Sequence, residues 1–286
     1  MSMIRTCLLA TSLVLTGFTQ TSYADDNSAT LAEVVAARSD EQKARDGSRH
    51  PVQTLEFFQL EPGMTVAEGL PGGGWYTRIL ANYLGADGVL YGLNYADRMW
   101  PLIRPGNPQW AADRIAATEN FAAEVATYTD NGITAQGFTF ESVPPEVEGT
   151  VDRVLLIRAL HNLNKFEEEA QTRSRALANV RAMLKDDGLV GVVQHRAPDT
   201  AFESGTNSSR GYMDEAAVIL MFEEAGFELV ADSDINANPL DQPSGEDTVW
   251  RLPPSLRGSE NDPEKQAELS AIGESDRMTL LFRKAP

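Results

Sequence analysis

The chain has 286 residues, with 42 acidic side chains against 24 basic ones, and a formal net charge of -18. Such a charge repels nucleic-acid phosphates and anionic lipid headgroups, which excludes the usual nucleic-acid-binding and membrane-surface classes. The single cysteine, Cys7, lies near the start, so the rest of the chain holds no disulfide, thiol nucleophile or cysteine metal site.

The first 24 residues have the pattern of a cleaved secretory signal peptide. Arg5 is the only charge among them, an apolar stretch begins at Cys7, and small residues at Ser22 and Ala24 suit a signal peptidase. The stretch is too short for a membrane span, and an uncleaved N-terminal anchor is the alternative interpretation. We therefore expect a periplasmic or secreted protein with no membrane insertion after cleavage, in which residues 25–50 form a helical extension.

The first half of the main domain, which we expect at 51–286, alternates helices with short strands. The predicted elements are a helix from Pro51, a strand at 65–67, a glycine-rich turn, a helix at 75–84, a strand at 89–93, a helix at 109–127 and a strand at 133–137. The irregular, proline-containing stretch before residue 109 and the helix after it indicate an insertion at about 97–130.

The second half continues the alternation. The predicted elements are a strand at 151–157, a helix at 166–184, a turn at 186–188, a strand at 189–195, a helix at 214–225, a strand at 227–232 and a closing strand at 277–283. Residues 236–275 are rich in Pro, Asp, Glu and Ser and read as a long acidic excursion. Because no helix is predicted between the last two strands, we expect an edge hairpin with an antiparallel final strand.

Alternating strands and helices predict an α/β fold, with a mainly parallel sheet and helices on both faces. Ligands bind such sheets at the carboxyl ends of the strands. Glu68 to Gly74, with the sequence EGLPGGG, lie at that end of the first strand. Glycine lets the backbone approach a ligand closely, so this turn predicts a nucleotide or nucleoside site. The structural alternative is that Glu68 only caps the following turn or helix.

Two of the three histidines, His161 and His195, follow strands on the same predicted edge. Imidazole titrates near neutral pH, so either is a candidate general base toward a substrate hydroxyl or amine. A hydrogen-bonded structural histidine is the alternative for each. No His or carboxylate triad has the spacing of metal ligands, so we expect no metal site. Further candidates for a substrate pocket or a solvated rim are Arg158, Arg196, Arg210 and Tyr212.

Several short motifs follow one another in a recognisable order. They are Pro71–Thr77, the strand from Asp152 that ends at His161, the Gly188 turn into the strand ending at His195, Ala225–Phe227, and Ser275–Arg277. In this order they resemble the class I S-adenosylmethionine-dependent methyltransferases, and more narrowly a group of exported, predicted methyltransferases of bacteria. The resemblance begins at about Arg38. It implies a Rossmann-like, seven-stranded sheet and S-adenosylmethionine as the methyl donor.

The resemblance also implies roles for individual residues. The donor would be held by Glu68, Gly69, Pro71, Gly72, Gly74 and Asn94, with Phe138 stacked on its adenine. Three positions depart from the family pattern. Leu70 replaces a glycine and narrows the approach to the methionine part of the donor. Asn94 replaces the carboxylate that takes both ribose hydroxyls and lacks its charge-assisted strength. Phe138 lies where an Asp commonly meets the adenine amino group.

The working hypothesis is methyl transfer from S-adenosylmethionine to a small molecule or an envelope component, with His161 or His195 taking a proton. The insertion at 100–127 and the loop at 196–212 are expected to cover the acceptor. One alternative is a non-catalytic exported metabolite-binding protein that retains the fold, motivated by Leu70 and Asn94. Another is a nicotinamide-dependent oxidoreductase, against which the missing second-strand carboxylate argues. The sequence does not indicate an oligomeric state.

Overall fold

Seven strands form one sheet in the order β3-β2-β1-β4-β5-β7-β6. The computed structural model describes residues 31–198 and 208–286. The strands are β1 (Thr65–Gly69), β2 (Val89–Asn94), β3 (Thr134–Thr139), β4 (Val151–Ile157), β5 (Leu184–His195), β6 (Phe227–Ser233) and β7 (Arg277–Lys284). β7 is antiparallel to β5 and β6, and the other pairs are parallel. The predicted fold, a mainly parallel seven-stranded α/β sheet with a C-terminal antiparallel pair, is confirmed.

The parallel register brings several strand ends to one edge of the sheet. Glu68 in β1 lies opposite Gly92 in β2 and Leu155 in β4. The segments that follow these strands therefore meet at the edge where ligands bind in open α/β sheets.

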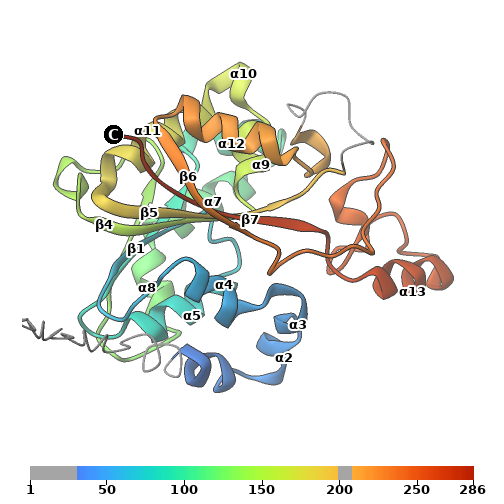
Figure 1. Cartoon of the computed structure of the whole chain (residues 1–286), viewed down its shortest axis with the longest axis horizontal. Helices are drawn as coiled ribbons and strands as arrows, with labels where there is room; N and C mark the ends of the chain where they lie inside the picture. Colours follow the sequence, from blue (N-terminus) through green and yellow to red (C-terminus); the bar gives the residue numbers. More distant parts are fainter. Residues whose placement is uncertain (1–30, 199–207) are drawn as a thin grey trace, which may run out of the picture.

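Helices cover both faces of the sheet (Figure 1). They are α2 (Asp40–Lys43), α3 (Asp46–Arg49), α4 (Pro51–Phe57), α5 (Trp75–Leu84), α6 (Trp100–Ile103), α7 (Pro108–Glu119), α8 (Phe121–Val125), α9 (Leu160–Asn164), α10 (Glu167–Ala170), α11 (Thr172–Met183), α12 (Glu215–Glu224) and α13 (Pro263–Ile272). One buried core includes Leu177 of α11 and Phe222 of α12, and the other includes Leu55 of α4 and Ile79 of α5. Each face of the sheet thus has its own apolar layer.

Two predicted helices are each broken in the structure. The helix predicted at 109–127 divides into α7 and α8 at Asn120, whose side chain donates a hydrogen bond to the carbonyl of Ala116 at 2.8 Å. The helix predicted at 166–184 divides into α10 and α11 at Gln171, which has φ +54°. A single left-handed residue turns the chain without any glycine or proline to signal it.

The turn predicted at 186–188 is also wrong, because β5 already begins at Leu184. Leu184 pairs with Val151 and Leu189 pairs with Arg153, so the register shifts between these positions. Asp186, Asp187 and Gly188 therefore lie in an irregularity within one continuous strand, and they do not connect two separate elements.

The connection between β6 and β7 contains a helix, α13, which the sequence analysis did not predict. Figure 1 shows α13 beyond the end of β7, away from the sheet. Because this helix does not cross the sheet, β6 and β7 still pair as antiparallel neighbours, as expected.

The segment before α4 packs onto the main domain. Residues 31–36 are helical, and Leu31 and Val35 are buried in the same core as α4 and α5. Ser39 and Gln42 form a capping box at the start of α2. The predicted signal peptide, residues 1–24, lies outside the described residues. Within 31–198 and 208–286, no helix is both long enough and apolar enough to cross a bilayer.

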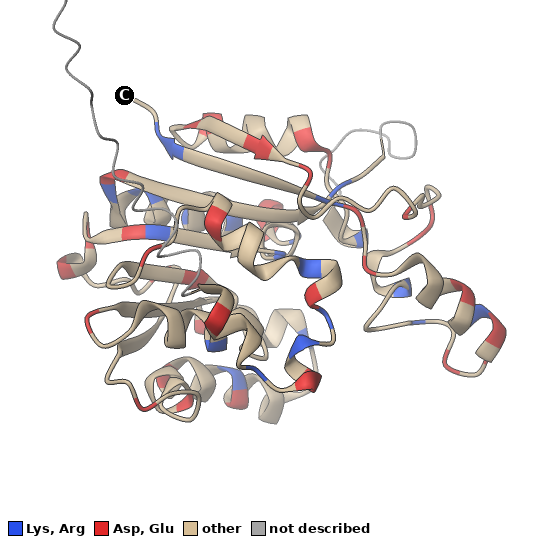
Figure 2. Cartoon of the chain, turned by 60° about the horizontal axis from the view of Figure 1, so that its bottom comes forward, with Lys and Arg blue, Asp and Glu red and all other residues tan. Residues whose placement is uncertain are grey.

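Acidic residues are distributed over many helices and loops rather than gathered in one patch (Figure 2). Their distribution agrees with a solvated, acidic surface. Buried basic side chains such as Arg49 and Arg277 contrast with this acidic surface.

Gly137 of β3 packs directly against the backbone of α7. A Cβ atom there would lie 1.9 Å from the carbonyl oxygen of Thr118 and 2.9 Å from Cβ of Phe121. We expect Gly137→Ala to lower the free energy of unfolding by about 1–3 kcal/mol in urea denaturation followed by circular dichroism. Gly47→Ala is the control, because a Cβ in α3 meets no heavy atom within 4 Å. Equal losses in both variants would contradict this packing argument.

Candidate functional site

The glycine-rich turn between β1 and α5 adopts the left-handed backbone region three times. The φ angles are +52° at Leu70, +61° at Gly72 and +72° at Gly74. Glycine adopts this region freely, whereas a residue with a Cβ is strained there. The backbone N–H of Leu70 donates to the carbonyl of Leu93 at 2.7 Å, which ties the turn to β2. The turn is therefore fixed by both neighbouring strands.

The three glycines that were expected to hold the donor, Gly69, Gly72 and Gly74, fall into two groups. A Cβ at Gly69 would lie 2.6 Å from the side chain of Leu156, and one at Gly74 would lie 2.6 Å from the hydroxyl of Tyr128. These two glycines permit close packing and line neither cavity described below. Gly72, in contrast, faces both cavities.

Two cavities meet at this turn. The first, which we call the histidine cavity, has a volume of about 470 Å³ and is lined by Glu68, His161 and His195, among others. The second, which we call the tryptophan cavity, has a volume of about 310 Å³ and is lined by Asn94, Trp100 and Trp110, among others. Both cavities are lined by Leu70, Pro71, Gly72 and Asn162. A ligand at the turn therefore has access to two compartments of different chemistry.

Glu68 lies at the end of β1 with only 4% of its surface exposed. The hydroxyl of Thr77 donates a hydrogen bond of 2.6 Å to its carboxylate. Burial raises the pKa of Glu68 to about 7, although the Thr77 hydrogen bond opposes this shift. A buried carboxyl group that titrates near neutrality, in a cavity, is a candidate ligand contact.

The protonation of His161 follows from its neighbours. The side-chain amide of Gln194 donates to the carbonyl of Gly211 at 2.8 Å, so its oxygen faces Nδ1 of His161 at 3.1 Å. Nδ1 must therefore carry the proton, which leaves the lone pair on Nε2. Burial, and the positive charges of Arg158 and Lys165, lower the pKa of His161 to about 4. His161 is thus neutral at physiological pH and able to accept a proton.

His195, at the end of β5, lies beside His161. The two ring centroids are 5.2 Å apart, and Nδ1 of His195 is 2.6 Å from the hydroxyl oxygen of Ser275. Burial, His161 and Arg158 all lower the pKa of His195 well below its usual value. The structure therefore brings both predicted histidines into one cavity, together with Glu68.

The tryptophan cavity offers polar groups that have no partner within the described residues. The indole N–H of Trp100 and Nε of Arg114 are both buried and unpaired among residues 31–198 and 208–286. Asn94 ends β2 on the same cavity. An apolar pocket with a few unpaired donors is suited to a planar, polar ligand such as a nucleoside.

Phe138 occupies a different place from the predicted base-stacking position. Its ring is buried in the core, 5.3 Å from the ring of Tyr91, and it lines neither cavity. Aromatic surface in the tryptophan cavity comes instead from Tyr95, Trp100 and Trp110. The insertion that was expected to cover an acceptor therefore lines the cavity beside Asn94.

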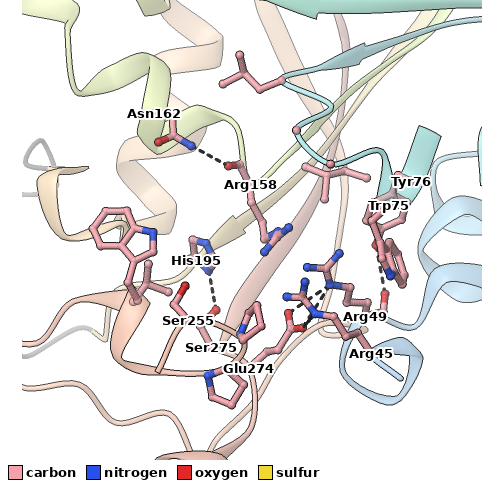
Figure 3. Close-up of a pocket in the computed structure, with 18 of the residues that line it drawn as sticks. Arg45, Arg49, Trp75, Tyr76, Arg158, Asn162, His195, Ser255, Glu274 and Ser275 are labelled. Carbon is pink, nitrogen blue, oxygen red and sulfur yellow. Dashed lines mark hydrogen bonds and ion pairs between the residues drawn. The ribbon is translucent and has the colours of Figure 1, made fainter. Parts of the chain in front are cut away.

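Several lining residues of the histidine cavity were not predicted. Arg45 directly precedes α3, and Arg49 is its last residue. Trp250 and Glu274 come from the acidic excursion. Figure 3 shows Arg45, Arg49 and Glu274 close together. Of the four polar candidates named from the sequence, only Arg158 lines this cavity. Arg196 instead pairs with Glu215, and the hydroxyl of Tyr212 donates to Asp241. Nothing local in the sequence marks Arg45 or Arg49 as site residues.

Residues 199–207 of the predicted covering loop lie outside the described residues. Across the described part of the chain, no group of three or more His, Cys, Asp or Glu side chains has an arrangement that could hold a metal ion.

Comparison with known proteins gives similarity only at the level of structure. No protein-family model matches the chain. No curated protein matches it either. Among solved structures, the [4+2]-cyclase SpnF aligns with a TM-score of 0.52 and 15% identity, over 91% of this chain and 94% of that one. This identity shows a shared fold alone.

Two further solved structures have methyl transfer in their names. A SAM-dependent methyltransferase from Aquifex aeolicus has a TM-score of 0.47 and 16% identity, over 72% of this chain and 93% of its own. The 1,6-didemethyltoxoflavin-N1-methyltransferase of Burkholderia thailandensis, with S-adenosylhomocysteine bound, has a TM-score of 0.46 and 12% identity, over 91% and 90% respectively. Function must therefore be argued from the residues of this chain.

Because the pKa of Glu68 is raised in the folded protein, we expect the free energy of unfolding to depend on pH. Between pH 4.5 and about 7 the folded protein keeps a proton that the unfolded chain releases, so this group lowers the free energy of unfolding as pH rises through that window. We expect Glu68→Gln to exceed the wild type in stability by up to about 3 kcal/mol at pH 8, and by much less at pH 5. Urea denaturation at both pH values measures the difference.

The lowered pKa values of His161 and His195 act in the opposite direction. As pH falls below 6.5, the unfolded chain binds protons that the folded protein does not, so these two groups lower the free energy of unfolding. Both histidines are present in the wild type and in Glu68→Gln, so their contribution cancels when the two proteins are compared. Glu148→Gln, at an exposed carboxylate, is the control and should equal the wild type at both pH values. A constant difference between Glu68→Gln and the wild type from pH 5 to pH 8 would overturn the argument.

Proposed function

We propose that this protein is an S-adenosylmethionine-dependent methyltransferase that acts on a small-molecule acceptor. The observation that carries the proposal is the meeting of two unlike cavities across the glycine-rich turn, at the carboxyl edge of a sheet with the order β3-β2-β1-β4-β5-β7-β6. Methyl transfer needs a donor and an acceptor side by side, and a donor that spans the shared turn would place its methyl group in the histidine cavity, where the acceptor would lie.

The residues at the turn fit the proposed donor. Asn94, Trp100 and Trp110 would hold its adenosyl part in the tryptophan cavity, where the indole N–H of Trp100 has no partner among the described residues and could donate to the ligand. Gly72 and Glu68 would hold its methionine part, because a backbone without Cβ and a buried carboxylate suit a close, cationic ligand. When bound, S-adenosylmethionine supplies an electrophilic methyl group, and the electron pair of the broken C–S bond stays on sulfur.

Protein residues then have three tasks. The apolar lining of the tryptophan cavity excludes water from the donor, and the shared turn aligns the two ligands. His161 is held by Gln194 with its Nε2 lone pair free, so it takes the proton of a hydroxyl or amine acceptor as the new bond forms. The ring of His195 packs beside that of His161, with the two centroids 5.2 Å apart.

Leu70 supports a second candidate function, a non-catalytic metabolite-binding protein. Its side chain lies on both cavities, at a position with φ +52° where glycine is favoured. A leucine there narrows the passage between the compartments. Under this alternative each cavity would hold a ligand, but no group would pass between them.

We also propose that the protein is exported, on the evidence of the signal-like pattern that ends at Ala24. The measurement is the intact mass and N-terminal sequence of the protein recovered from the periplasm or medium of a bacterial host. We expect a mature chain that begins at Asp25. Recovery of the full-length chain from the cytoplasm alone would overturn export without affecting the proposed chemistry.

The proposed donor site predicts the outcome of a calorimetric titration with S-adenosylmethionine and S-adenosylhomocysteine. We expect micromolar binding to the wild type and at least tenfold weaker binding to Gly72→Ala, since a Cβ enters the shared wall of the cavities. Gly149→Ala is a matched control: φ is +66° there, against +61° at Gly72, and a Cβ meets nothing within 4 Å. Both substitutions strain the backbone similarly, but only the first lies on the cavities.

Equal weakening in both variants would mean that backbone strain, not the donor site, explains the loss. Absence of binding to a wild type that unfolds cooperatively would overturn the methyltransferase proposal. Leu70→Gly then separates the alternatives, because gain of donor binding in that variant would identify Leu70 as the group that closes the site.

A further inference from the structure

Three arginines pair with one carboxylate, Glu274, at one end of the histidine cavity, and a fourth, Arg158, lines the same cavity. We call Arg45, Arg49, Arg158, Arg277 and Glu274 the arginine cluster. Glu274 lies 2.5 Å from Nε of Arg45, 3.3 Å from Nε of Arg49 and 3.1 Å from Nη1 of Arg277. Burial lowers the pKa of Arg49 to about 9 and that of Arg158 to about 10, so both remain charged at neutral pH. The cluster therefore has a formal surplus of three positive charges.

Much of the hydrogen-bonding capacity of the cluster is unused. Arg49 is 1% exposed, yet its Nη1 and Nη2 have no partner among residues 31–198 and 208–286. Within the same residues, Nη2 of Arg45 and Nε of Arg158 and Arg277 are also buried and unpaired. Each unsatisfied buried donor destabilises a protein by about 1–3 kcal/mol. Arg45, Arg49 and Arg158 line the cavity, and unpaired buried donors on such residues indicate a missing ligand.

Arg158 is held in place by a strained backbone. Its φ angle is +56°, and its backbone N–H donates to the carbonyl of Val193 at 2.6 Å. Figure 3 shows its side chain directed toward Arg49 and Arg45, with His195 nearby. A left-handed, non-glycine residue costs about 1–3 kcal/mol, and such residues concentrate at binding sites. The strain therefore serves to bring a guanidinium group to the cavity.

The proposed methyl donor does not neutralise this surplus. S-adenosylmethionine has one carboxylate but two cationic groups, the ammonium and the sulfonium, so its net charge is +1. Glu68, even when ionised, removes only one positive charge from the cavity as a whole. A second, anionic ligand would supply the neutralising charge.

We propose that the histidine cavity binds an anionic small molecule through a carboxylate or phosphate group held by Arg49 and Arg158. Planar guanidinium groups bind both kinds of oxyanion with paired hydrogen bonds. The cavity is also lined by Trp250, Leu252 and Pro253, which suit an apolar body next to the charged group. Identification of this ligand as the methyl acceptor rests on the proposed function, whereas the anion site itself does not.

The test is titration of the protein with benzoate and phenyl phosphate, with neutral benzamide as the uncharged control, by calorimetry and thermal shift. We expect saturable binding of at least one anion and none of benzamide. Arg158→Gln should weaken binding at least tenfold. Arg158→Lys should weaken binding less, because lysine retains the positive charge but lacks the planar, paired donors of a guanidinium group. Arg49→Gln should match Arg158→Gln if it folds. Arg98→Gln, at an exposed residue paired with Glu141, should bind as the wild type does.

Saturation with S-adenosylhomocysteine separates the two possible sources of the anion. We expect benzoate or phenyl phosphate to bind equally well with the donor site filled, and Arg158→Gln to retain its affinity for S-adenosylhomocysteine. Displacement of the anion, with loss of nucleoside binding in Arg158→Gln, would assign the cluster to the carboxylate of the donor and overturn the proposal. Binding of neither anion to a folded protein would also overturn it. Anion binding without any nucleoside binding would support the anion site and reject the methyltransferase proposal.

Discussion

The carboxylate of Glu274 is the interaction on which the architecture of the site depends. It accepts hydrogen bonds from Arg45 and Arg49, which are 229 and 225 residues away in the chain, and from Arg277 in β7. Loss of one partner of such a buried pair leaves an uncompensated charge, which typically destabilises a protein by about 3–5 kcal/mol. Arg49 also lies over the ring of Trp75, 4.5 Å from its centroid. The N-terminal helices, α5 and the segment just before β7 are thereby joined into one wall of the histidine cavity.

This wall sets the electrostatics of the cavity. Burial disfavours every charged form, so it raises the pKa of Glu68 and lowers those of the histidines. The positive charge of Arg158 lowers both histidine pKa values further. An anion bound at Arg158 would offset that repulsion and raise the pKa of His161, while burial would still hold it below its usual value. His161 would then be a stronger base when the second ligand is present than when it is absent.

The predictable and unpredictable features differ in the sequence separation of their causes. Helix α5, for example, was predicted at its observed bounds, because the glycines before it and Gly85 after it are local signals. The edge that carries Glu68, His161 and His195 was predictable because alternating strands and helices imply parallel strands, whose carboxyl ends share one edge. The arginine cluster was not predictable, since long-range ion pairs assemble it and no local pattern marks its members. The prediction for Phe138 relied on its place along the strand, whereas core packing determines where its ring lies.

Leu70 shows how the divided site arises from the backbone. The turn needs left-handed conformations in order to pass from β1 into α5, and the bond from Leu70 to the carbonyl of Leu93 fixes the first of them. A glycine there would relieve the strain of the left-handed backbone. With leucine, an apolar residue lines both the aromatic compartment and the basic one. Ligands of unlike chemistry can therefore occupy adjacent compartments, with only the Leu70–Gly72 turn and Asn162 common to both.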